Sequence, residues 1–223
     1  MSFWSLPWNR EASRRRSRAT HRDIKRKSPR SLLIESLEVR QLLSVVPLGD
    51  ERLVNAVTTG TQKLAESGNA VAPLPDGGYL VSWTSINQDG DGAGVYARRF
   101  DPTGEPLAGE FRVNTRTVGD QKSPSVAAAG DGSTMIVWES NGQDGDRIGV
   151  YGQRFDAEGQ ALGTEFRVNV TAEGDQETPT VACLADGGFV TVWSGNGSGD
   201  TWGIFGRRYD GSGVAQGGEF LIN

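Results

Sequence analysis

Residues 131–169 read DGSTMIVWESNGQDGDRIGVYGQRFDAEGQALGTEFRVN, and this stretch decides the fold because much of it recurs. Aligned without gaps, residues 76–114 are identical to it at 21 of 39 positions. The clearest marker is a tryptophan that returns after 55 residues, as Trp83, Trp138 and Trp193. Self-similarity at a fixed period indicates a repeat architecture, in which one small structural unit is used several times.

Each repeat contains short runs of β-branched and aromatic residues that are separated by Gly, Asp and Asn. Such runs are typical of strands joined by tight turns. Asp131-Gly132 and Asp186-Gly187 suit hairpin turns, which need positive φ angles. Four antiparallel strands in roughly 55 residues is close to the ~40–50 residues of familiar propeller blades. The sequence therefore predicts an all-β fold of tandem four-stranded antiparallel units that resemble the blades of a β-propeller.

The repeat domain is expected to occupy residues 49–223, in three full units: about 63–118, 119–173 and 174–223. Residues 51–55 read ERLVN and echo EFRVN at 110–114, so they predict a leading strand before the first unit. A β-trefoil-like barrel also uses three four-stranded units and is the alternative fold, although an extra strand does not belong in it. Uncovered sheet edges invite pairing with another chain, so self-association through the blade edges is expected.

The charge of the chain changes sign at about residue 48. Residues 1–48 hold 11 Lys and Arg against 4 acidic residues, and the remainder holds 12 against 24. A segment this charged buries little apolar surface, so residues 1–48 are expected to be a basic, disordered N-terminal or targeting segment. No part of the sequence approaches the ~18 apolar residues of a membrane span. The acidic remainder is a poor surface for nucleic acid, whose phosphates bind Lys and Arg.

Cysteine and histidine are too scarce for several kinds of chemistry. Cys183 is the only cysteine, which excludes an intramolecular disulfide and a cysteine-based zinc site. His21 is the only histidine and lies in the basic segment. The repeat domain therefore lacks the imidazole of a Ser-His-Asp triad or of a histidine-rich metal site.

Acidic residues recur in the loops that follow the tryptophan strands: Asp89, Asp91, Asp144 and Asp146. Carboxylates two residues apart in a glycine-rich turn can direct oxygens to one centre, which is what Ca²⁺ requires. In the third unit only Asp200 remains of the pair. Asp and Gly also dominate turns for conformational reasons alone. The four aspartates are therefore candidate calcium ligands, with turn formation as the alternative.

Trp202 breaks the repeat, because Ala93 and Ile148 hold its place in the other units. It lies beside the polar loop of the third unit. The repeated tryptophans are expected in the core, where their large apolar surface is buried. Trp202 is thus the aromatic candidate for contact with a ligand.

Two resemblances concern the location of the protein. Residues 36–44, SLEVRQLLS, resemble the LEPR-XLL segment of large, repeat-containing planctomycete proteins of the exported or surface-located kind, but Val39 stands where that family has proline. The motifs GDQ, GQDGD, GVYGQRF and EFRVN are similar to repeats of large bacterial surface and hemolysin-like adhesin proteins. Both resemblances imply an extracellular or cell-surface protein, and neither implies a reaction.

Three classes of function are compatible with these patterns. A non-catalytic surface or extracellular module with a structural or adhesive role is expected first, because duplicated side chains suit repeated weak contacts whose avidity grows with number. The partner is expected to be a surface polysaccharide or a protein. A calcium-assisted carbohydrate- or protein-binding module is the alternative. A propeller glycoside hydrolase is less favoured, because it needs two carboxylates in a unique arrangement.

Overall fold

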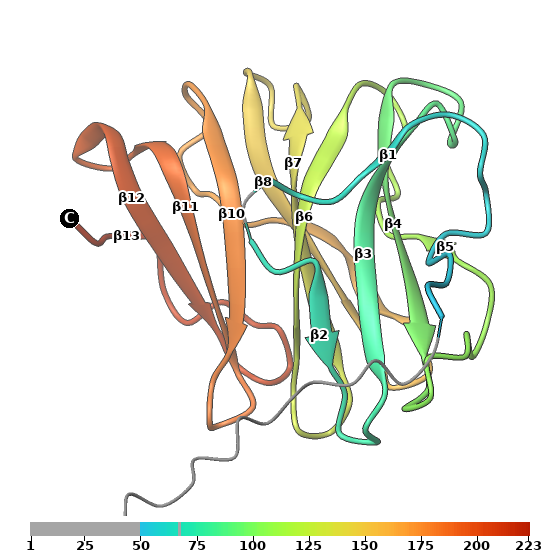
Figure 1. The fold of residues 1–223 in the computed structure, drawn as a ribbon. Helices are drawn as coiled ribbons and strands as arrows, with labels where there is room; N and C mark the ends of the chain where they lie inside the picture. The colour runs from blue at the N-terminus through green and yellow to red at the C-terminus, as the bar shows by residue number, and fades with distance from the viewer. Residues whose placement is uncertain (1–49, 67) are drawn as a thin grey trace, which may run out of the picture. The chain divides into compact units, whose positions relative to one another are not determined.

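The protein is described from a computed structural model, which places residues 50–66 and 68–223 (Figure 1). The chain divides into two parts, Met1–Gly49 and the repeat domain Asp50–Asn223. The basic segment 1–48 lies outside the described residues, together with the LEPR-XLL-like residues 36–44. Their expected disorder and targeting role therefore stay predictions.

The middle of the repeat domain is a four-stranded antiparallel sheet, here called unit 2. Its strands follow one another in chain order: β6 (Gln121–Ala128), β7 (Thr134–Asn141), β8 (Ile148–Phe155) and β9 (Ala161–Arg167). The Asp131-Gly132 turn joins the first two strands, and Gly132 has the positive φ of 85° that such a turn requires. Trp138 pairs with Tyr151 in the neighbouring strand.

The C-terminal sheet, unit 3, repeats this order. Its strands are β10 (Gln176–Cys183), β11 (Phe189–Gly197), β12 (Asp200–Tyr209) and β13 (Phe220–Leu221). Trp193 pairs with Phe205, as its counterpart does with tyrosine in unit 2. The recurring sequence thus produces a recurring sheet.

The N-terminal sheet, unit 1, differs in its first strand. Its strands are β1 (Gln62–Lys63), β2 (Val71–Pro73), β3 (Tyr79–Ile86), β4 (Ala93–Phe100) and β5 (Phe111–Arg112). Both β1 and β2 pair with β3, so the two together replace the single first strand of the other units. The interval from Gln62 to Asp76 is four residues longer than that from Gln121 to Asp131. This insertion divides the strand.

The expected fold class is confirmed: the structure is all-β and consists of tandem antiparallel sheets that resemble propeller blades, two with four strands and one with five because its first strand is divided. The sheets of residues 50–66 and 68–223 do not close into a barrel, so the trefoil-like alternative is not the one that forms. Residues 51–55, expected as a leading strand, lie outside any strand; the backbone carbonyl of Val54 instead accepts a hydrogen bond from the Arg98 side chain of unit 1. Within the described part of the chain, no helix is long and apolar enough to cross a membrane.

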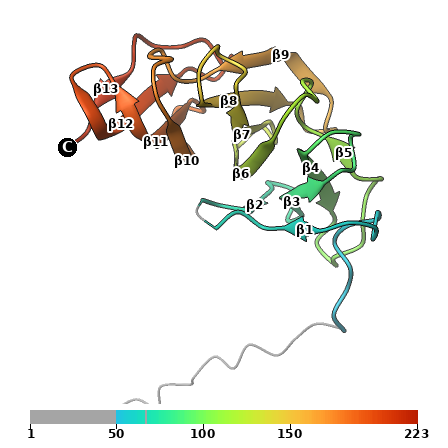
Figure 2. The same cartoon turned by 90° about the horizontal axis from the view of Figure 1, so that it is seen from above.

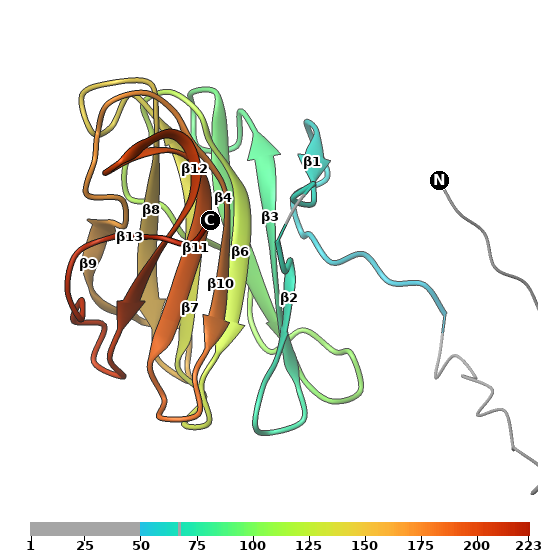
Figure 3. The same ribbon diagram turned by 90° about the vertical axis from the view of Figure 1, so that its left-hand side faces the viewer.

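The first strands of successive units lie next to each other: β2 contacts β6, and β6 contacts β10 (Figures 1 and 2). Small residues allow this approach. The backbone N–H of Val126 in β6 donates to the carbonyl of Asn69, which precedes β2 (2.8 Å). The buried hydroxyl of Ser125 accepts the N–H of Asn69 and that of Val181 in β10, both at 3.2 Å. Ser125, itself in β6, is therefore bonded to the backbone just before β2 and to that of β10. Figure 3 shows the backbone of these three first strands, β2, β6 and β10.

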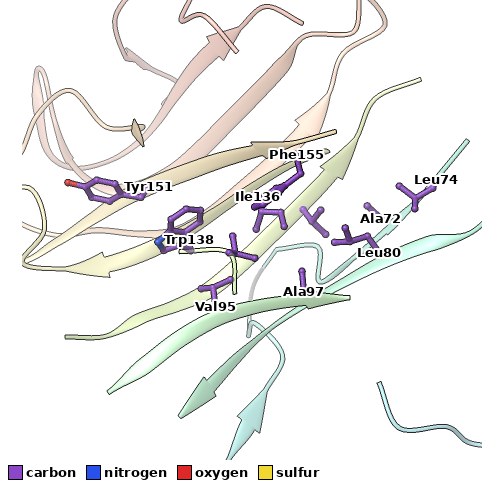
Figure 4. Packing of buried hydrophobic residues seen from close by; sticks show 11 residues of the cluster. Ala72, Leu74, Leu80, Val95, Ala97, Ile136, Trp138, Tyr151 and Phe155 are labelled. Atoms are coloured by element: carbon purple, nitrogen blue, oxygen red, sulfur yellow. The ribbon is translucent and has the colours of Figure 1, made fainter. Parts of the chain in front are cut away.

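The hydrophobic core lies between the sheets and consists of separate clusters. Between units 1 and 2, aliphatic side chains of unit 1 face aromatic side chains of unit 2: Leu80, Val95 and Val113 against Trp138, Tyr151 and Phe155 (Figure 4). Between units 2 and 3 the same pattern recurs: Met135, Val137, Val150 and Val168 against Phe189, Trp193, Phe205 and Tyr209. Each of these interfaces therefore joins the mainly aliphatic forward face of one unit, which also contains Phe111 or Phe166, to the back face of the next unit, which is rich in aromatic residues. The three repeated tryptophans are buried, as expected.

Candidate functional site

The candidate site is a pocket of about 420 Å³ where the first strands of the three units begin, here called the inner-strand pocket. Its polar lining comes from all three units and from the segments that lead into them: Lys63, Glu66, Thr84, Asp120, Lys122, Ser123, Glu139, Glu177 and Thr178. Lysines and carboxylates face the same space, so the pocket combines hydrogen-bond donors with acceptors.

A backbone irregularity at the start of the first strand places the polar groups of this pocket. Ser123 and Thr178 have φ angles of 54° and 53°, which residues other than glycine seldom adopt, and each lies at a break in the strand register. This turn directs their N–H groups to the preceding unit. Ser123 donates to Oγ1 of Thr84 (3.1 Å), and Thr178 donates to Oε1 of Glu139 (2.8 Å).

Glu139 is the distinctive group of the pocket. It is only 5% exposed, and burial raises the pKa of its carboxyl, while the Thr178 N–H and Lys122, whose Nζ lies 3.6 Å from Oε2, act in the opposite direction. Because the folded pKa lies above the unfolded one, the folded state binds the proton more tightly. The contribution of Glu139 to stability therefore falls as the pH rises from the unfolded toward the folded pKa.

Sequence reasoning missed Glu139, although the signal was present in the repeat. Thr84 and Ser194 occupy its position in the other two units, so a carboxylate replaces a hydroxyl at this one place. Comparison of strand positions between the units would have identified this residue.

The loop aspartates serve as acceptors for the connection to the next unit. Oδ2 of Asp91 accepts the N–H of Gly119 (3.1 Å), and Oδ2 of Asp146 accepts that of Gly174 (2.8 Å). These glycines lie in the segment that leads into the following sheet. The second aspartate of each loop therefore fixes the connection between units.

The first aspartate of each loop faces the last strand of its own unit. Oδ2 of Asp144 accepts Nδ2 of Asn169 (3.0 Å), and Asp89 makes the same, longer contact with Asn114 (3.5 Å). A Cβ added at Gly149 would lie 2.6 Å from Oδ2 of Asp144, so a larger residue there would displace this carboxylate. Across residues 50–66 and 68–223, no three acidic, histidine or cysteine side chains gather as a metal site would require. Calcium binding by the four aspartates stays a prediction.

A recurring asparagine and glutamine pair joins each unit to the next. Oδ1 of Asn169 accepts the buried N–H of Val150 (2.9 Å), and its Nδ2 donates to the carbonyl of Thr171 and to Oε1 of Gln176, both at 2.8 Å. Asn114 and Gln121 repeat the arrangement between units 1 and 2. The glutamine of this pair belongs to the GDQ motif. Its asparagine partner was missed, although Asn114, Asn169 and Asn223 recur in register.

Glutamates within or directly before the last strand make a further link. Oε2 of Glu165 accepts the N–H of Thr115 (2.6 Å), and Oε2 of Glu219 accepts that of Val170 (2.7 Å). In each case the glutamate binds the backbone that follows the last strand of the preceding unit. Backbone N–H groups at the end of one unit thus find their hydrogen-bond acceptor in a side chain of the next unit.

Trp202 lies at the start of β12 with 61% of its surface exposed. The backbone N–H of Trp202 donates to Oδ1 of Asp200 (3.0 Å). A second hollow of about 410 Å³, lined by Thr171, Asn196 and Asp200 among others, lies beside this loop, and Trp202 is not part of its lining. The structure does not bring Trp202 to the inner-strand pocket, so its contact with a ligand stays a prediction.

Comparison with known proteins gives no family assignment. No protein-family model matches the chain, and no curated protein matches it in sequence. Among solved structures, the endo-arabinase from Bacteroides thetaiotaomicron VPI-5482 is similar at a TM-score of 0.43 and 16% identity, over 66% of this chain and 60% of that one. A protein of unknown function from Dyadobacter fermentans DSM 18053 is similar at a TM-score of 0.30 and 10% identity, over 72% of this chain and 71% of that one. The match therefore spans less than two thirds of the arabinase, and likenesses this distant assign no chemistry.

Proposed function

We propose that this chain is a non-catalytic repeat protein of the cell surface or the extracellular space, with a structural or adhesive role. One observation carries the proposal. The asparagine, glutamine, glutamate and aspartate side chains that recur in the sequence bind the backbone and side chains that connect one unit to the next. Side chains committed to the same structural bonds in successive units are not free to act as acid, base or nucleophile.

The surroundings of Glu139 also favour binding or structure over catalysis. Hydrolysis of a glycosidic bond uses two carboxyl groups that flank the bond, one of them free to transfer a proton. Oε1 of Glu139 accepts the Thr178 N–H, and Oε2 faces Lys122. This carboxylate is therefore engaged on both oxygens. The resemblance of residues 36–44 and of the repeats to surface proteins supports the location, and a surface polysaccharide or protein is the partner class.

Affinity electrophoresis of the full chain through gels that contain isolated cell-surface polysaccharides tests this function. We expect retardation by at least one polysaccharide and no release of new reducing ends on prolonged incubation. Glu139→Gln is expected to leave both results unchanged, because a glutamine oxygen still accepts the Thr178 N–H. Release of reducing ends by the unaltered protein but not by Glu139→Gln would instead establish a glycoside hydrolase.

Calcium-assisted binding is a second candidate, favoured by the state of Asp89. Its Oδ1 atom is buried and has no hydrogen-bond donor among the described residues. An unpaired carboxylate oxygen is costly to bury, and a bound cation would offset that cost. Asp91 lies two residues away, as a calcium loop of this kind requires.

Thermal unfolding in calcium and in chelator tests this candidate. Millimolar Ca²⁺ should raise the melting temperature, since a ligand that binds only the folded state stabilises it. Two carboxylates per loop suit a Kd of about 10⁻⁴–10⁻³ M.

Changing Asp144 and Asp146 together to Asn should remove much of that shift. The change keeps an acceptor for Gly174, so the melting temperature in chelator should hardly move. Asp200→Asn is the control and should preserve the shift. Identical melting curves in calcium and chelator would leave these aspartates as structural acceptors.

A further inference from the structure

Unit 3 exposes a surface that is buried in the other two units. The forward face of unit 2 includes Val150 and Val168, both fully buried by the aromatic back face of unit 3. Their counterparts in unit 3 are Ile204 and Ile222, which are 38% and 52% exposed. The repeat thus keeps large β-branched side chains at positions that nothing in the described chain covers.

The exposed face of unit 3 also repeats a hydrogen bond of the buried face of unit 2. The N–H of Ile204 donates to Oδ1 of Asn223 (2.7 Å), as the N–H of Val150 does to Oδ1 of Asn169 (2.9 Å). The last strand of unit 3 therefore has the same position as in unit 2. Phe220, Leu221 and Trp202 are exposed beside it. Several large apolar side chains together on one sheet indicate a contact surface rather than ordinary solvent exposure.

The matching surface is the aromatic back face of unit 1. Its buried members are Val81, Trp83, Tyr96 and Phe100, and the side chain packed against them from outside the sheet is Val54. Nη1 of Arg98 donates to the carbonyl of Val54 (3.1 Å), as Nη1 of Arg207 does to that of Val168 (3.0 Å). Val54 thus occupies the place that the last strand of a preceding unit holds elsewhere.

The contact of Glu110 extends this equivalence. Its Oε2 accepts the N–H of Ala56 (2.5 Å), as Oε2 of Glu219 accepts that of Val170. Residues 51–57, here called the leading segment, therefore imitate the last strand of a preceding unit and the backbone that follows it. The segment lacks the other three strands of such a unit, so it covers the back face of unit 1 with much less apolar surface than a full sheet would.

We propose that the forward face of unit 3 binds the back face of unit 1 in a second copy of this chain, and that β13 with Ile222 takes the place of the leading segment there. The contact is the one that already joins units 1 and 2 and units 2 and 3, so both sides are shaped for it. Such a contact is head-to-tail. Two chains supply six units, within the roughly 4–8 blades of closed propellers, so we expect a dimer. The proposal does not rest on the proposed function.

Sedimentation velocity of the full chain over a range of concentrations tests the proposal. We expect a reversible dimer. Ile204→Asp and Ile222→Asp should each weaken dimerisation by at least about tenfold, because a charge would enter an apolar contact. Both side chains are exposed in the single chain, so the melting temperature at low concentration should stay unchanged. Leu162→Asp is the matched control, since this residue and its counterpart Leu107 are exposed within the array. It should dimerise like the unaltered protein.

A second variant tests the exchange of the leading segment. Val54→Asp should loosen that segment, uncover the back face of unit 1 and strengthen dimerisation several-fold. Adding Ile222→Asp to Val54→Asp should remove the gain, which nonspecific aggregation of exposed aromatic residues would not do. A monomer at all concentrations, or a dimer that neither isoleucine substitution weakens, would overturn the proposal.

Discussion

Trp138→Ala is expected to lower the free energy of unfolding by about 3–5 kcal/mol, as truncation of a fully buried tryptophan typically does. Trp138 has no exposed surface and packs between units 1 and 2 with Leu80 and Ile136. Its indole N–H has no acceptor among the described residues, so the loss comes from apolar contact and from the cavity that remains. The site is held by two sheets, and neither can move inward alone to fill the space.

Equilibrium unfolding in urea, followed by tryptophan fluorescence and by circular dichroism, measures this loss. Trp202→Ala is the control and should change the free energy of unfolding by less than about 0.5 kcal/mol, because the side chain is exposed. In repeat arrays, contacts between neighbouring units contribute to stability and couple their unfolding. Weakening the interface between units 1 and 2 is therefore expected to let these units unfold at different urea concentrations. A loss below about 1 kcal/mol, with coincident transitions, would show that this interface does not hold the array together.

The fold could be predicted because the same residues return in register. Trp83, Trp138 and Trp193 marked the second strand of each unit, and the Asp-Gly pairs marked the hairpins that precede it. Period and turn chemistry are local properties, and a repeat displays them several times. The broken first strand of unit 1 was not predicted, because only this unit carries the four-residue insertion before Asp76 and the repeat does not show where the strand divides.

The candidate site was harder to predict because it depends on contacts between units. Nothing within the first-strand sequence says that Ser123 and Thr178 adopt positive φ, since Ser and Thr seldom do so. That conformation is what directs the Thr178 N–H to Glu139. Similarly, Asp146 reads as a loop residue, and its bond to Gly174 appears only when the next unit is in place. The sequence of an acidic loop is therefore compatible with a turn, with a link between units and with a calcium site.

The asparagine that ends each unit provides the sharpest test of how units are joined, because the chain holds buried and exposed versions of it. Asn169→Ala would leave the buried N–H of Val150 without an acceptor and remove the bonds to Thr171 and Gln176. A buried donor without a partner costs about 1–3 kcal/mol, and the lost bonds add to this. We expect the free energy of unfolding to fall by about 2–4 kcal/mol, measured by urea denaturation.

Asn223→Ala is the matched control, since Asn223 accepts the N–H of Ile204 at the equivalent position but is exposed. Water can replace that bond, so the change should be within about 0.5 kcal/mol. The difference between the two substitutions isolates burial by the neighbouring unit from the hydrogen bond itself. Equal losses for Asn169→Ala and Asn223→Ala in the monomer would mean that the asparagine acts only within its own sheet. A loss for Asn223→Ala that grows with protein concentration would instead place Asn223 in a contact between chains, where the forward face of unit 3 is covered.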